Sequence, residues 1–106
     1  MKVKLSVLER IGLLNILPTE ENYLTYKLVR DLKTELSFSD KDFKELKIIT
    51  TQDQKVRWDE KADKGKSVEV PDVIVALVKV KLESLEKEKK INDQNAPLYE
   101  KFVLDK

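Results

Sequence analysis

The chain has 106 residues, which is the size of one domain and enough to bury a single hydrophobic core without disulfides or metal ions. Apolar residues make up 41% of the sequence and charged residues 39%, a balance that predicts a folded chain with a strongly charged surface. The 21 Lys and Arg residues are offset by 20 Asp and Glu residues, so the net charge provides no overall attraction to nucleic acid or to an acidic membrane. We therefore expect one domain spanning residues 1–106.

The residue types that the sequence lacks exclude several chemistries. Without Cys there is no thiolate nucleophile or cysteine zinc site, and without His there is no His-based triad. Gly12 and Gly65 lie in different elements, so they cannot form a glycine-rich phosphate loop. Asp53, Asp59 and Asp63 are close in sequence, but interleaved Lys residues and their spacing match no known cation loop. We expect a protein that is not an enzyme and has no cofactor, no metal site and no small-molecule substrate.

No part of the sequence indicates secretion or membrane insertion. The apolar run after the first five residues is broken by Glu9 and Arg10, and no small-residue cleavage site follows. The longest apolar stretch, Val73–Val78, is far shorter than the roughly 20 residues needed to cross a bilayer. We expect a cytoplasmic protein without a membrane partner.

The first predicted helix covers Val7–Leu17. Ser6 and Glu9 have the spacing of a capping box, and Pro18 ends the helix. Apolar residues surround nearly the whole circumference of this helix, so we expect it to be central or to face a second chain.

The second and third predicted helices follow directly. Thr19 is the expected cap of a helix that runs from residue 20 to about residue 36, with Tyr23 and Tyr26 away from its apolar side. A stripe of Leu residues with Val29 beside it predicts the core-facing side: Leu24, Leu28, Leu32 and Leu36. Ser39 and Asp42 predict a cap for a short third helix, residues 40–46, with Phe38 and Phe43 as apolar anchors.

After the third predicted helix, the sequence changes from a helical pattern of apolar residues to short segments typical of β-strands. Ile48–Thr51 and Val56–Trp58 are rich in β-forming residues and flank the turn-like 52–54, so we expect a hairpin. After a charged loop, Ser67–Val70 is a candidate third strand.

The last part of the sequence is expected to be helical. Pro71-Asp72 favours a helix start, and the helix should run to about Lys89. The alternating segment 78–82 taken alone predicts a strand, but pairs such as Glu83 with Lys87 favour a helix, which we expect. A turn at 92–95 leads to a last helix, 96–104, whose docking residues are Leu98, Tyr99 and Phe102. The fold class is α+β, mainly helical with four to five helices, and with a small antiparallel hairpin or three-stranded sheet between the third and fourth helices.

Surplus apolar surface predicts that the protein binds another protein. The first helix has more apolar circumference than one neighbouring layer covers, and aromatic rings lie off the Leu stripe of the second helix. We expect a protein partner or a homodimer. The expected contact residues are Tyr23, Tyr26, Lys27, Arg30 and Trp58. The alternative is that the fourth and last helices cover these apolar residues within one chain.

A second hypothesis is DNA binding. Three helices followed by a basic, aromatic hairpin are the layout of a winged-helix domain, in which the hairpin contacts phosphates. The basic residues around Trp58 are Lys55, Arg57, Lys61, Lys64 and Lys66. Against this, the segment 40–45 carries three acidic residues and lacks the Arg, Asn or Gln that read base edges.

Features spread over most of the chain resemble those of small uncharacterised proteins from bacteriophages and prophages. They are Leu17-Pro18, the break Leu36-Ser37-Phe38-Ser39, the hairpin with Val56-Arg57-Trp58, and the ending Leu98-Tyr99-Glu100-Lys101-Phe102. The resemblance implies an accessory or host-interacting factor that acts by binding and has no enzymatic activity.

Overall fold

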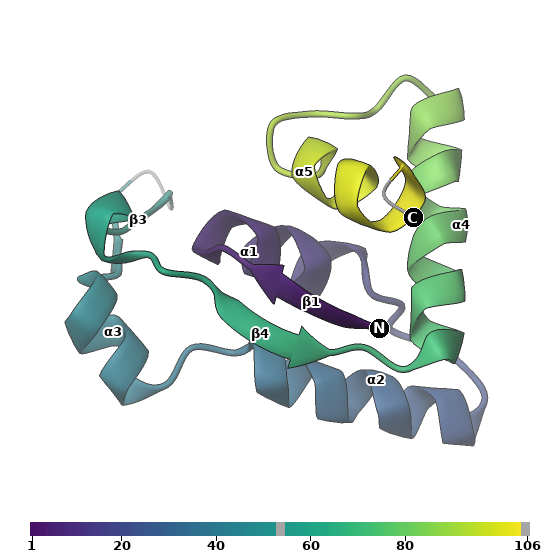
Figure 1. The fold of residues 1–106 in the computed structure, drawn as a ribbon, viewed down its shortest axis with the longest axis horizontal. Coiled ribbons are helices and arrows are strands. Elements are labelled where there is room, and N and C mark those ends of the chain that lie inside the picture. Colours follow the sequence, from purple (N-terminus) through teal and green to yellow (C-terminus); the bar gives the residue numbers. More distant parts are fainter. Residues whose placement is uncertain (53–54, 105–106) are drawn as a thin grey trace.

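The fold is α+β and mainly helical. The computed structural model describes residues 1–52 and 55–104, so the Asp53-Gln54 part of the predicted turn lies outside the described residues (Figure 1). Along this part of the chain the elements are β1 (Lys2–Leu5), α1 (Val7–Ile16), α2 (Tyr23–Leu36), α3 (Asp40–Leu46), β2 (Ile49–Thr50), β3 (Val56–Arg57), the 3-10 turn η1 (Glu60–Ala62), β4 (Lys66–Glu69), α4 (Asp72–Lys87), α5 (Ala96–Tyr99) and the π-helical turn η2 (Glu100–Leu104).

The strands form two separate two-stranded antiparallel sheets. The predicted hairpin is confirmed as β2 and β3, with Ile49 opposite Arg57. The predicted third strand is also present as β4, but it pairs with β1 at the start of the chain, where Val3 lies opposite Val68. The alternation Lys2-Val3-Lys4-Leu5, with buried Val3 and Leu5, is the local reason for β1, which the sequence analysis did not predict.

Side-chain caps set the starts of the first three helices. Both predicted capping boxes are confirmed, at Ser6 before α1 and at Ser39 before α3. The predicted start of α2 is wrong, because its cap is Asn22, whose side chain accepts a hydrogen bond from the backbone N–H of Thr25. Asn is a stronger N-cap than Thr, so the helix begins three residues later than predicted.

The Leu stripe of α2 is only half in the core. Leu32 and Leu36 are buried with Val29, whereas Leu24 is 74% exposed and Leu28 is 38% exposed. Each step of four residues turns about 40° beyond a full circle, so three steps shift the stripe by about 120° around the helix. The stripe therefore leaves the buried face toward the N-terminal end of α2.

The core lies between the β1–β4 sheet and four helices. The segment 78–82 is helical as predicted, because it lies inside α4. Leu98 on α5 and Phe102 on η2 are buried in the core, and both turns pack against α4 (Figure 1). The fully buried side chains of the core are Leu5, Val7, Leu13, Val29, Leu36, Val68, Val70, Ile74, Val78, Leu82, Leu98 and Phe102. Among the described residues, no helix has both the length and the apolar character needed to span a bilayer.

Candidate functional site

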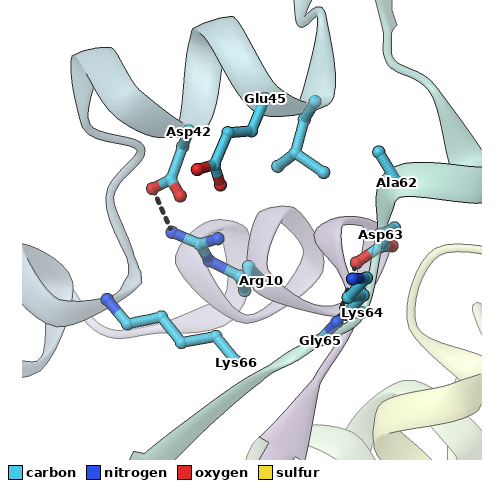
Figure 2. A pocket seen from close by; sticks show the side chains of 9 residues that line it. Arg10, Asp42, Glu45, Ala62, Asp63, Lys64, Gly65 and Lys66 are labelled. Atoms are coloured by element: carbon cyan, nitrogen blue, oxygen red, sulfur yellow. Dashed lines mark hydrogen bonds and ion pairs between the residues drawn. The ribbon is translucent and has the colours of Figure 1, made fainter.

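The buried guanidinium of Arg10 joins α1 to the break between α2 and α3 (Figure 2). Its Nε donates to the carbonyl of Leu36 at 3.1 Å, and its Nη2 donates to the carbonyl of Ser37 at 2.7 Å. The same Nη2 lies 3.4 Å from Asp42, and the guanidinium stacks 4.0 Å above the centre of the Phe38 ring. Arg10 thus satisfies carbonyls at the end of α2 and has a structural role.

A polar hollow of about 210 Å3 lies beside Arg10. Figure 2 shows Asp42 and Glu45 on α3 facing Arg10, with Lys66 on the other side of the guanidinium. The backbone N–H of Ser39, helped by the Arg10 guanidinium, holds the pKa of Asp42 below its usual value. Asp42 accepts a hydrogen bond from the backbone N–H of Ser39, and Asp63 accepts from those of Val7 and Gly65, so both carboxylates have structural roles.

A second charged pair, Glu9 with Lys101, joins three elements. Glu9 on α1 is only 5% exposed, and the Nζ of Lys101 on η2 lies 2.9 Å from its Oε1 and 2.7 Å from its Oε2. The same Nζ donates to the carbonyl of Lys4 on β1 at 2.6 Å. Burial is the largest influence and raises the pKa of Glu9, but hydrogen bonds from Lys101 and Ser6 together outweigh it and hold that pKa below 4.5. Glu9 is therefore ionised at neutral pH and supports the fold.

An apolar hollow with a volume of about 440 Å3 lies between α1 and the hairpin. Leu8 and Ile11 on α1 are half-buried here, which locates the surplus apolar surface predicted for the first helix. Trp58, directly after β3, is half-buried in the same hollow. We call this hollow the Trp58 groove, and its lining residues are Leu8, Ile11, Lys55, Val56, Trp58 and Gln94.

One wall of the Trp58 groove, the turn with Gln94, packs closely against α1. The turn that carries Gln94 packs so tightly on α1 that a Cβ added at Gly12 would lie 2.8 Å from the Gln94 carbonyl oxygen. A smaller hollow of about 320 Å3 adjoins the groove and shares Val56 and Trp58 with it. The sequence analysis singled out Trp58 but missed Leu8 and Ile11 as its neighbours, because they lie nearly fifty residues away in the chain.

The predicted contact residues on α2 form a different surface. Tyr23 is 68% exposed, and Tyr26, Lys27 and Arg30 are also exposed. The Arg30 guanidinium lies 5.9 Å from the centre of the Tyr26 ring. Neither hollow at Trp58 contains a residue of α2, so the structure divides the predicted contact residues into two surfaces.

The basic residues of the DNA-binding hypothesis are also divided. Lys55 and Arg57 lie at the hairpin, Lys61 is on η1, and Lys64 lines the hollow beside Arg10. The ammonium of Lys66 is held against α2, where it donates to the carbonyl of Glu35 at 2.7 Å. The described structure therefore does not gather these five side chains on the hairpin.

Comparisons of the chain with protein-family models, with curated proteins and with solved structures give no match. Of the three Asp residues considered as cation ligands, Asp53 is outside the described part of the chain. Asp59 caps η1, and Asp63 accepts hydrogen bonds from the backbone N–H groups of Val7 and Gly65. Within the described ranges, no group of three acidic residues is placed to hold a metal ion.

Proposed function

We propose that the protein is a non-catalytic interaction module whose Trp58 groove binds an apolar segment of a protein partner. The observation that carries this proposal is the set of half-buried apolar side chains around Trp58, which no other part of the described chain covers completely. Trp is enriched among the residues that dominate protein–protein binding, because one ring contributes a large apolar area with few rotatable bonds.

The lining of the groove also defines the partner's chemistry. Its volume falls within the range of pockets that take large side chains. Among the described residues, the charged side chains at this surface are Lys55 in the groove and Arg57 and Glu60 in the adjoining hollow, so basic residues outnumber acidic ones. We therefore expect the partner segment to carry one or two large apolar residues with a carboxylate next to them. A binding role agrees with the resemblance to small bacteriophage accessory proteins.

Peptide selection tests this proposal and does not require the partner to be identified first. A displayed library of random linear peptides is enriched on the immobilised protein, and binders are counter-tested against Trp58→Ala and against the double variant Tyr23→Ala/Tyr26→Ala. We expect selected peptides to combine apolar and acidic residues, to lose at least tenfold in affinity for Trp58→Ala, and to keep their affinity for the α2 variant. Peptides that bind Trp58→Ala as well as the original protein would overturn the assignment.

The same variants distinguish a partner protein from a second copy of this chain. We expect a monomer in sedimentation equilibrium at concentrations that saturate peptide binding. A dimer that dissociates on Trp58→Ala would instead make the homodimer the occupant of the groove, and would contradict the partner proposal.

A further inference from the structure

The hydrogen-bond pattern of the β1–β4 sheet shows which backbone groups point outward. The N–H of Val70 donates to the carbonyl of Met1 at 2.7 Å, and the Met1 amine donates to the carbonyl of Val70 at 2.9 Å. In an antiparallel sheet, such bonded pairs alternate with pairs whose N–H and C=O groups point away from each other. With the observed register, Ser67 and Glu69 are in the second kind of pair, so their backbone groups face the outer edge of β4.

The two outer edges of this sheet differ in what covers them. On β1, the carbonyl of Lys4 points outward and accepts a hydrogen bond from Lys101, so η2 covers that edge. On β4, no hydrogen bond from residues 1–52 or 55–104 reaches the outward N–H and C=O groups of Ser67 and Glu69. Both residues are exposed. An uncovered strand edge of this kind is a template for pairing with another chain.

The space beside this edge is partly apolar and acidic. Figure 1 shows α2 running alongside β4, and a hollow of about 160 Å3 lies between them. Its lining residues are Leu28, Asp31, Leu32, Glu35, Glu69 and Pro71. A strand added at the usual spacing of about 4.8 Å from β4 would place alternate side chains over this hollow.

The charges in the hollow define the occupant. Among the described residues, Glu35 has one ion-pair partner, the Lys66 ammonium at 3.9 Å, and Glu69 has one, the N-terminal amine at 3.5 Å. Asp31 forms no ion pair with any residue that the structure describes. Because Leu28, Asp31 and Glu35 line one hollow, we expect a Lys or Arg stem to lie against Leu28 with its charged end near Asp31 and Glu35. Two copies of this chain meeting edge to edge would bring their acidic residues together, which disfavours self-pairing.

We propose that the outer edge of β4 binds an extended basic segment of a partner protein by β-strand addition, with alternate Lys or Arg side chains lying over α2. The segment pairs with the N–H and C=O groups of Ser67 and Glu69. This surface shares no residue with the Trp58 groove, so it goes beyond the function proposed above.

A synthetic peptide of alternating Lys and Val tests the proposal directly, with alternating Glu and Val as the control. We expect the Lys-Val peptide to bind in the micromolar to millimolar range and to slow hydrogen exchange at the Ser67 and Glu69 amides. Asp31→Asn should weaken binding by about twofold to fivefold, in line with one exposed ion pair. Equal binding of the Glu-Val peptide, or no binding of either peptide, would overturn the proposal.

Matched variants separate strand addition from simple charge attraction. Ser67→Pro removes an outward N–H that plays no part in pairing with β1, whereas Ser67→Ala keeps it. We expect Ser67→Pro to abolish binding and Ser67→Ala to retain it. A second test leaves the protein unchanged and compares two peptides that are N-methylated at alternate residues, one at the odd and one at the even positions. Only the peptide whose methyl groups point away from β4 should bind, because the other has lost the N–H groups that pair with it. Binding by both methylated peptides would contradict strand addition, while unchanged binding by Trp58→Ala would separate this site from the Trp58 groove.

Discussion

We expect the free energy of unfolding to fall more when Lys101 is replaced than when its partner Glu9 is replaced. Lys101→Met removes the ammonium and leaves the Glu9 carboxylate unpaired at 5% exposure. Removing one partner of a fully buried pair costs about 3–5 kcal/mol. Because the Lys101 side chain is 37% exposed, water partly replaces its ammonium, and we expect a loss of about 2 kcal/mol.

The opposite substitution is expected to be milder. In Glu9→Gln the side-chain oxygen still accepts the hydrogen bond from the Ser6 N–H, and the remaining Lys101 ammonium reaches water. We expect a loss of about 1 kcal/mol, the size of one ordinary hydrogen bond. In urea unfolding at neutral pH the double variant should lose less than the sum of the single losses, since no unpaired buried charge remains. A Glu9→Gln loss equal to or larger than the Lys101→Met loss would refute this reasoning.

The pair also predicts how stability depends on pH. The pKa of Glu9 is lower in the folded protein than its usual 4.5, so its contribution is complete above pH 4.5 and is lost as the pH falls through the folded pKa. Glu9→Gln should therefore show a shallower loss of stability in acid than the original protein. Lys101→Met should raise the pKa of Glu9, because burial raises that pKa and the hydrogen bond and charge of Lys101 no longer lower it. NMR titration of the Glu9 carboxyl carbon measures the direction of this change.

Three further predictions concern packing and charge. Gly12→Ala should lose about 1–3 kcal/mol in thermal unfolding, because its Cβ meets the Gln94 carbonyl, and an unchanged melting temperature would contradict that close approach. Leu82→Ala should lose about 2–5 kcal/mol, whereas Leu24→Ala should change stability by less than about 0.5 kcal/mol, and similar losses would contradict their different burial. Duplex DNA should show no binding, or only binding without steep salt dependence, whereas an affinity that falls steeply with salt and is lost in Arg57→Ala would favour the DNA-binding hypothesis.

Local signals in the sequence were sufficient for the elements that depend on neighbouring residues. The capping boxes at Ser6 and Ser39 fixed two helix starts, because each box is complete within four residues. The fourth helix was predictable from its Pro71-Asp72 start even though 78–82 alternates like a strand.

Features that depend on distant residues could not be predicted. The pairing of β1 with β4 joins segments more than sixty residues apart, and each strand is too short for its alternation to identify a partner. The burial of Arg10 has no local signal either, since its acceptors are carbonyls at the end of α2. The Trp58 groove is a similar case, because α1 and the hairpin form it only in three dimensions.

The most direct test of the proposed function uses the intrinsic fluorescence of Trp58, which is the single tryptophan of the sequence. The peptides selected on the immobilised protein are titrated while the emission of this half-buried ring is followed. We predict a saturable shift to shorter wavelength, because the partner's apolar residues displace water from the ring, and we predict that Ile11→Asp abolishes the shift while Leu24→Asp does not. Saturated peptide binding with unchanged Trp58 emission would contradict the account.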